Sequence, residues 1–339
     1  MMDEKMKKIY SRLMDRESKE IYKSRVFFSL TGDYSEICNI VAGTAQAGEI
    51  RRKVLEFSGM PVFLWGTGFW ADYLYRGFPD IRWNGFIDNY PQIETKNDLP
   101  VLAAEKFREK YQSALVVIAS TVWHKEIYEQ LKSWGYAMEK IVDAGAMMLE
   151  LFEQQYFDLP SLPHKEKEVF VDAGCFDGLS VRNFLRWSGG NYESIMAFEP
   201  DKKCYEQCEE RLKDVGKLTL IDKGVWSSRE VLSFRATGAS DSAVSSDGEE
   251  QIETVQLDEV LDDRNVTFLK MDIEGAEKEA LLGAQKTIER CRPKLAISIY
   301  HKPEDIWELP ELILDMYPDY ELYVRHYSLR DAETVLYAI

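Results

Sequence analysis

The sequence predicts an α/β protein with two parallel β-sheets, the second larger than the first. Short apolar segments rich in β-branched residues alternate with segments of helical periodicity, first within residues 59–150 and again from residue 168 onward. This alternation is typical of strand–helix–strand units in a parallel sheet. The chain has 339 residues, 45% of them hydrophobic, which exceeds what one hydrophobic core usually holds. We therefore expect two globular domains.

Composition limits the partners of the protein. The formal net charge of -17 argues against extended contact with nucleic acid, which depends on clustered Lys and Arg. The N-terminal stretch MMDEKMKKIYSRLMDRESKEIY is charged throughout, and no later segment is long and apolar enough to cross a bilayer. Five scattered cysteines argue against a disulfide framework. We expect a cytoplasmic protein whose partners are small molecules or proteins and not membranes.

Residues 1–58 are predicted to form a helical segment. Their apolar residues recur at helical spacing, and Gly32 ends the first long helical stretch. We expect these helices to pack against a neighbouring part of the protein.

Residues 59–150 are predicted to form a small Rossmann-like domain. The apolar segment MPVFLW runs into Gly66 and Gly68, a helix follows, and the next strand ends at Asp88. This pattern is typical of a dinucleotide-binding turn, in which a helix N-terminus faces a phosphate and the acidic residue binds a ribose. The same glycines also suit a tight strand-to-helix turn that holds no ligand. Whether this domain binds a ligand stays open.

A second domain is predicted for residues 168–339, after a linker at residues 151–167 that contains two prolines followed by charged residues. Two segments, EVLSFRA and EQIETVQL, are expected to pair antiparallel around a polar loop, and YELYVRHY with ETVLYAI to form a closing hairpin. The remaining strands are expected in EVFVDAG, SIMAFEP, LTLIDKGVW, VTFLKMDIEG and KLAISIYH, and the helices at residues 177–187, 201–212, 276–290 and 303–316.

The turn in FVDAGCFDGLS is the strongest candidate for a ligand site. In an open parallel sheet, ligands bind at the carboxyl ends of the strands where the strand order reverses, and the first strand-to-helix turn lies there. We expect Asp172 to point into this crevice, and Gly174 and Gly178 to let the backbone approach a ligand closely. Because a pyrophosphate would repel Asp172, a ligand with positive charge fits better.

Two further strand ends extend this site. Glu199 lies 21 residues after Gly178, where a carboxylate can accept hydrogen bonds from both hydroxyls of a ribose. Asp222 ends the third strand and suits one edge of an adenine. A favourable interaction with the N-terminus of the following helix would explain Glu199 alone, but not its combination with Asp172, Gly174 and Gly178. A nucleoside with a cationic, amino-acid-like tail is S-adenosylmethionine, which we predict as the cofactor.

The segments FVDAGCFDGLS, AFEP, LKMDIEGAEKEALLGA and RPKLAISIYHKPED resemble, in order and spacing, the FkbM-type S-adenosylmethionine-dependent methyltransferases. The resemblance covers Glu168 to Ile339, and KMDIEGAE is its most specific part. It implies the seven-stranded doubly wound sheet of the class I methyltransferases. It also implies methyl transfer to a hydroxyl oxygen, commonly on a sugar, glycan or macrolide.

By position, the resemblance assigns two sets of residues. Those matching the first motif and the ribose carboxylate are Asp172, Gly174, Gly178, Ser180 and Glu199. Those matching the segment after the fourth strand are Lys270, Asp272, Glu274, Gly275 and Glu277. The chain departs from the family at Ser298, where many members carry a glutamate, and at Cys175-Phe176, where small or polar residues are common. Substrate handling is expected to differ accordingly.

Asp272, Glu274 and His301 are the predicted catalytic residues. Methyl transfer is an in-line displacement that needs the acceptor oxygen about 3 Å from the methyl carbon and a base for the hydroxyl proton. His301 is the better base because an imidazole titrates near neutral pH, although a capping role would also explain it. Asp272 could orient the acceptor or, with Glu274, hold a divalent cation. Acidic residues also suit a helix start, and we expect no metal.

Two alternatives involve the first domain. It could be the active part, binding a nicotinamide dinucleotide or a nucleotide-sugar for redox or epimerase chemistry. It could also dock a nucleotide-linked sugar for the second domain. A nitrogen or carbon acceptor is not excluded by any residue of the chain.

Overall fold

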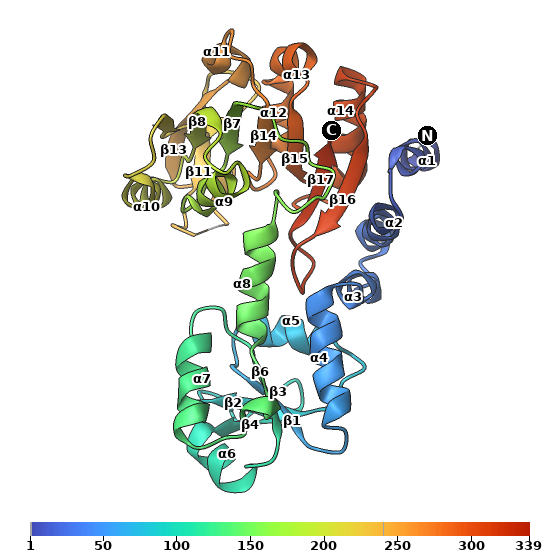
Figure 1. The fold of residues 1–339 in the computed structure, drawn as a ribbon, viewed down its shortest axis with the longest axis vertical. Helices are drawn as coiled ribbons and strands as arrows, with labels where there is room; N and C mark the ends of the chain where they lie inside the picture. The colour runs from blue at the N-terminus through green and yellow to red at the C-terminus, as the bar shows by residue number, and fades with distance from the viewer. Residues whose placement is uncertain (1, 240) are drawn as a thin grey trace. The chain divides into compact units, whose positions relative to one another are not determined.

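The structure of the protein is a computed structural model that describes residues 2–239 and 241–339 (Figure 1). The chain folds into two compact units. The larger unit takes in the chain up to Leu30, Gln154–His326 and Ala332–Ile339, and the smaller unit takes in Thr31–Glu153 and Tyr327–Asp331. Across the described residues, no helix has both the length and the apolar character that crossing a membrane requires.

The helices of the predicted segment 1–58 are divided between the two units. The first two belong to the larger unit, where Ser18 accepts a hydrogen bond from the backbone N–H of Val324 (2.9 Å), and the last two belong to the smaller unit. Helical periodicity shows that a helix has a buried face but not which sheet covers it. The helices are α1 (Met2–Arg12), α2 (Arg16–Thr31), α3 (Ser35–Ala42) and α4 (Ala45–Glu56).

The smaller unit contains a six-stranded sheet of order β3-β4-β2-β1-β5-β6, which is parallel apart from the β3–β4 pair. The parallel sheet agrees with the prediction, but β3 and β4 were not predicted. Its strands are β1 (Val62–Trp65), β2 (Trp83–Asp88), β3 (Thr95–Lys96), β4 (Leu99–Ala103), β5 (Leu115–Ile118) and β6 (Ile141–Val142). Its remaining helices are α5 (Phe69–Gly77), α6 (Ala104–Lys110), α7 (His124–Ser133), the 3₁₀ helix η1 (Met138–Lys140) and α8 (Ala144–Gln154).

The larger unit contains a seven-stranded sheet of order β16-β17-β15-β14-β7-β8-β9. Only β17 runs antiparallel to its neighbours, and the strand order reverses between β7 and β14. This is the predicted seven-stranded doubly wound sheet with its closing hairpin. Its strands are β7 (Glu168–Ala173), β8 (Tyr192–Phe198), β9 (Leu218–Ile221), β14 (Phe268–Met271), β15 (Lys294–Ser298), β16 (Leu322–His326) and β17 (Thr334–Ala338).

Helices fill the connections of this sheet. Figure 1 shows α1 beside α14, and Lys5 on α1 forms an ion pair with Glu311 on α14. The predicted helix 276–290 is broken at Gly283, because a Cβ there would lie 2.1 Å from the carbonyl oxygen of Trp226. The helices are α9 (Leu179–Trp187), α10 (Lys202–Leu212), α11 (Leu257–Leu261), α12 (Glu277–Leu282), α13 (Gln285–Cys291) and α14 (Asp305–Met316).

A separate four-stranded sheet of order β10-β13-β11-β12 lies between the third and fourth parallel strands in the sequence. The predicted antiparallel pairing of β11 with β13 is present. The single strand predicted in LTLIDKGVW is divided, because its first part joins the large sheet as β9 and its second part pairs with β13. The strands are β10 (Gly224–Val225), β11 (Val231–Arg235), β12 (Ala243–Val244) and β13 (Glu250–Val255).

Part of the segment predicted as a linker, residues 151–167, lies in the core of the larger unit. The Phe157 ring contacts Phe170 and Phe268, with ring centroids 6.0 and 5.5 Å apart. Phe170 in turn stacks on Phe184 at 4.2 Å. The prolines and charges of this segment are typical of a linker, but Phe157 is buried because it completes the core.

Candidate active site

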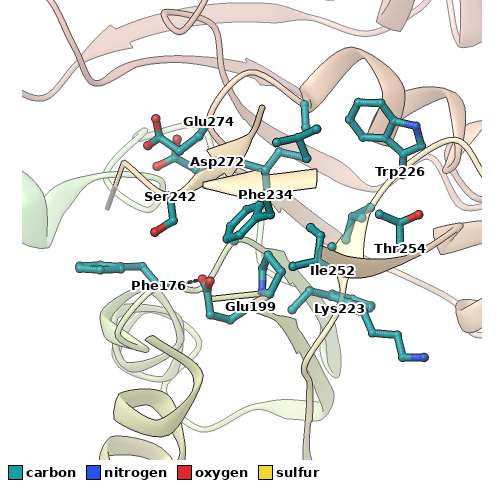
Figure 2. Close-up of a pocket in the computed structure, with 18 of the residues that line it drawn as sticks. Phe176, Glu199, Lys223, Trp226, Phe234, Ser242, Ile252, Thr254, Asp272 and Glu274 are labelled. Carbon is teal, nitrogen blue, oxygen red and sulfur yellow. Dashed lines mark hydrogen bonds between the residues drawn. The ribbon is translucent and has the colours of Figure 1, made fainter. Parts of the chain in front are cut away.

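A pocket opens at the carboxyl ends of β7, β8 and β14, with the four-stranded sheet as one wall (Figure 2). About 610 Å³ of unfilled space lies within the pocket and its open mouth. Its lining includes Gly174, Phe176, Phe198, Glu199, Pro200, Lys223, Trp226, Phe234, Ser242, Ile252, Thr254, Asp272 and Glu274.

The two glycines of the turn after β7 have different roles. Gly174 lines the pocket with φ of +85°, and a Cβ there would lie 2.0 Å from the carbonyl oxygen of Asp272. Gly178 has φ of +81° at the start of α9, and a Cβ there would meet the side chain of Leu212. Both positions therefore need glycine, the first for a close approach beside the pocket and the second for helix packing.

Asp172 does not point into the crevice. Its side chain is fully buried, with Oδ1 3.0 Å from the Lys270 ammonium and Oδ2 accepting a hydrogen bond from the Ser180 hydroxyl. Lys270 also donates to the carbonyl oxygen of Gly174. A buried carboxylate needs such partners, and these draw it behind the turn. Asp172 and Ser180 thus fix the shape of the turn that borders the pocket.

Glu199 lies at the end of β8 and faces the pocket (Figure 2). Its Oε2 accepts a hydrogen bond from the N–H of Phe176, and its Oε1 accepts one from the N–H of Asp201, both at 2.9 Å. Burial raises the pKa of Glu199 to about 7, although these two hydrogen bonds act in the opposite direction. Each oxygen keeps a lone pair, so the carboxylate can accept two further hydrogen bonds, as from the hydroxyls of a ribose.

The chain after β9 reaches the pocket at residues other than the predicted one. Asp222 is exposed and lies outside the described pocket lining, whereas Lys223 lines it and pairs with Glu253 (2.5 Å). Ser242 comes from the polar loop between β11 and β13, and its hydroxyl donates to Asp201 (2.6 Å). The sequence indicated a loop too long for a tight hairpin, but nothing in it indicated that the loop borders the pocket.

The acid–histidine cluster consists of Asp272, Glu274, Glu277 and His301, and it brings together the three predicted catalytic residues. Nε2 of His301 lies 3.4 Å from Asp272 and 3.5 Å from Glu274, and Nδ1 lies 3.0 Å from Glu277. Asp272 and Glu274 line the pocket, while His301 lies behind them. Burial alone would lower the pKa of His301, but the carboxylates of Glu277, Glu274 and Asp272 raise it well above its usual value.

The backbone of the turn that carries this cluster is strained. Glu274 adopts φ of +53°, a conformation that side-chain-bearing residues rarely take, and Gly275 follows with φ of +91°. Such strain persists only where the surroundings impose it, and it is concentrated at functional sites. The motif KMDIEGAE therefore encodes a turn that presents Glu274 to the pocket.

Tyr156 is a site residue that the sequence did not reveal. Its hydroxyl donates to Oδ2 of Asp272 at 2.6 Å and accepts a hydrogen bond from Gln155 at 2.9 Å. Burial would raise the pKa of Asp272, but Lys270, His301 and this hydrogen bond hold it below its usual value. The residue lies in the segment that composition predicted as a linker, and no local pattern connects it with a strand end 116 residues away.

In the smaller unit, the Gly66 turn is explained by local packing. Gly66 has φ of +126°, and a Cβ there would lie 2.9 Å from the carbonyl oxygen of Ala119. The carboxylate of Asp88 accepts hydrogen bonds from the Thr67 hydroxyl (2.5 Å) and the N–H of Tyr90 (2.9 Å). Both oxygens are therefore used within the turn. Nucleotide binding by this unit stays a prediction.

The sheet order, the antiparallel strand β17 and the pocket beside the reversal of strand order define a class I methyltransferase fold. Residues 172–327 match the family model described as the Methyltransferase FkbM domain. The larger unit thus carries an FkbM methyltransferase domain, as the sequence resemblance predicted.

Two relatives illustrate this relation. The chain is 24% identical over 189 residues to 2-O-methyltransferase NoeI of Sinorhizobium fredii (strain NBRC 101917 / NGR234), an alignment that covers 48% of this chain and 76% of that protein. The crystal structure of Methyltransferase FkbM from Methylobacillus flagellatus KT superposes with a TM-score of 0.53 at 19% identity, covering 92% of this chain and 100% of that one. The structural likeness concerns the fold alone.

Proposed function

We propose that the protein is an S-adenosylmethionine-dependent O-methyltransferase that acts on a hydroxyl of a sugar or glycan. The observation that carries the proposal is Glu199, a buried carboxylate that lines the pocket at the end of the second strand of a methyltransferase sheet. A carboxylate in this position, with both oxygens anchored by backbone N–H groups, is built to receive a ligand with paired hydroxyls.

The residues of the pocket fit this cofactor. Gly174 leaves space beside the turn that a Cβ would close, and Glu199 can hold the ribose. The aromatic side chain of Phe176 and the apolar side chains of Phe234 and Ile252 line the same pocket and suit a flat base. S-adenosylmethionine supplies a methyl group that is activated by the adjacent sulfonium charge.

The acid–histidine cluster is proposed to handle the acceptor. Asp272 lines the pocket, and Tyr156 holds its carboxylate at 2.6 Å, so its pocket-facing oxygen can accept a hydrogen bond from the acceptor hydroxyl. His301 lies 3.4 Å from Asp272, and we propose that Asp272 takes the hydroxyl proton while His301 orients this carboxylate. The relative named a 2-O-methyltransferase supports a hydroxyl acceptor. The aromatic face of Trp226 at the pocket suits a sugar ring.

Calorimetric titration with S-adenosylmethionine and S-adenosylhomocysteine tests the cofactor. We expect Glu199→Gln to weaken binding at least tenfold, because a hydrogen bond to a charged group contributes about 1.5–3 kcal/mol. Glu259→Gln is the matched control, since Glu259 on α11 is exposed, pairs with Arg229, and is not among the described residues that line the pocket. A folded wild type that binds neither compound would refute the proposal, and NAD and nucleotide-sugars at the Gly66 turn would then be titrated.

The acceptor class is tested with methyl-labelled cofactor and a panel of sugars and oligosaccharides. We expect a labelled O-methyl product whose formation is lost in Asp272→Asn. Label found on nitrogen or carbon would contradict the proposed acceptor but not the proposed cofactor.

A further inference from the structure

The acid–histidine cluster has the spacing of a ligand set for a metal ion. Asp272, Glu277 and His301 each offer one ligand atom, and these atoms lie within 4.8 Å of one another. Glu274 adds a further carboxylate, 3.5 Å from Nε2 of His301. Ligand atoms held about 2.1 Å from a metal at right angles to one another are about 3 Å apart. The separations of 3.4 and 3.5 Å at Nε2 are close to this value.

Hydrogen bonds satisfy only part of the cluster. Asp272 accepts hydrogen bonds from the hydroxyls of Tyr156 and Tyr300. Oε1 of Glu277 accepts one from the N–H of Ile273. Both ring nitrogens of His301 and Oε2 of Glu277 are buried, and among the described residues none of these atoms has a hydrogen-bond partner of good geometry. The exposed fractions of the two side chains are only 7% and 1%. Buried polar atoms without such a partner are rare in proteins, and an ion or an ordered water is a usual explanation.

The charges also require a cation. The cluster contains three carboxylates and one imidazole, so it keeps a net negative charge even when the ring is protonated. Lys270 is close by, but it pairs with Asp172 at 3.0 Å and donates to the carbonyl oxygen of Gly174. Glu277 is buried and the other two carboxylates are partly exposed, and carboxylates this close together repel one another, so a cation stabilises them.

We propose that the acid–histidine cluster binds a divalent cation that accepts nitrogen and oxygen ligands, such as Mn²⁺ or Zn²⁺. A mixed imidazole and carboxylate set suits these ions better than Mg²⁺ or Ca²⁺, which prefer oxygen alone. Whichever nitrogen of His301 binds the ion, the other keeps a carboxylate neighbour, and this is how ligating histidines are usually oriented. Because Asp272 and Glu274 line the pocket, the ion would be reachable from it.

This proposal differs from the expectation of no metal in the sequence analysis. Sequence spacing shows that Asp272 and Glu274 share a strand end, but two carboxylates alone are a weak ligand set. The sequence also places His301 at a neighbouring strand end. Glu277 joins the other residues from α12, and only the folded chain shows this.

The test is a titration of chelator-treated protein with MnCl₂, followed by electron paramagnetic resonance. We expect one tightly bound Mn²⁺ per chain, with nitrogen coupling from an imidazole in the pulsed spectrum. His301→Gln should bind Mn²⁺ at least tenfold more weakly. Glu308→Gln is the control, because Glu308 on α14 pairs with Lys278 at the surface and its loss removes one nearby charge without touching the cluster.

Three outcomes would overturn the proposal: a folded wild type that binds no Mn²⁺ and no Zn²⁺, binding that His301→Gln leaves unchanged, or bound Mn²⁺ without nitrogen coupling. If His301→Gln does not fold, as judged by circular dichroism, the nitrogen coupling of the wild type decides. Titration of the same metal-free sample with S-adenosylhomocysteine separates this proposal from the proposed function. Cofactor binding without Mn²⁺ binding refutes the metal site alone, and Mn²⁺ binding without cofactor binding refutes the function alone.

Discussion

The raised pKa of Glu199 predicts a loss of stability as the pH rises. In the unfolded chain this carboxyl group ionises near its ordinary pKa of 4.5, whereas in the folded protein it keeps its proton until about pH 7. Between these two pKa values the folded state binds more protons than the unfolded state, so the free energy of unfolding falls as the pH rises. The shift from 4.5 to about 7, at about 1.4 kcal/mol per pH unit, corresponds to about 3 kcal/mol.

Glu199→Gln removes this titration. The amide cannot accept hydrogen bonds at both positions, so the N–H of Phe176 or of Asp201 loses its partner at a cost of about 1–3 kcal/mol that does not depend on pH. The pH-dependent part of the free energy of unfolding that comes from Glu199 is then the difference between the pH profiles of the wild type and of Glu199→Gln. We expect Glu199→Gln to gain about 3 kcal/mol relative to the wild type between pH 4 and pH 8.

Urea denaturation of both proteins across this pH range measures the difference. Since the chain has two units, the comparison uses the transition that the substitution moves, and titrating groups common to both proteins cancel. Parallel pH profiles of the wild type and Glu199→Gln would refute the reasoning, because the carboxyl group would then titrate alike in the folded and unfolded states.

Three further predictions follow from the same site. Cofactor binding should tighten from pH 5 to pH 7 in the wild type and not in Glu199→Gln, because the ionised carboxylate accepts hydrogen bonds from both ribose hydroxyls more strongly than the neutral acid does; equal pH profiles in calorimetry would contradict this. Tyr156→Phe should lower kcat at least tenfold and leave the affinity for S-adenosylhomocysteine unchanged. The substitution removes a hydrogen bond to Asp272 but none to the cofactor site. A changed affinity with a normal kcat would count against this prediction. Gly174→Ala should abolish cofactor binding, because an added Cβ would lie 2.0 Å from the carbonyl oxygen of Asp272. Gly68→Ala should retain binding, because an added Cβ there meets no described atom within 4 Å. Calorimetry measures the binding, and circular dichroism shows whether each variant folds.

The sequence predicted those parts of the molecule that are encoded locally. Most strands of both parallel sheets, though not β3 and β4, follow from short apolar segments. The place of Glu199 follows from its distance along the chain from the first turn. The strand ends carrying Asp272 and His301 were also placed correctly, because neighbouring parallel strands bring their carboxyl ends to one edge.

The roles of individual side chains were harder to predict, because partners distant in sequence decide where a side chain points. Asp172 occupies the expected strand end, yet Lys270, from a strand nearly a hundred residues later, draws its carboxylate away from the pocket. Gly283 breaks a helix with good helical periodicity because the backbone of Trp226 passes against it. Neither effect leaves a pattern in the local sequence.

Tyr156 shows how the same limit applies to the catalytic side of the pocket. Its segment has the prolines and charges of a linker, and composition alone cannot separate an aromatic residue that fills a core from one that serves a site. The structure separates them by partners: Phe157 contacts aromatic rings, whereas the hydroxyl of Tyr156 is held between Gln155 and Asp272. A buried hydroxyl aimed at a pocket carboxylate has a polar task that packing does not require, since a phenylalanine would fill the same space. Part of the segment that composition predicts as a linker therefore lies in the larger unit and supports a carboxylate of the pocket.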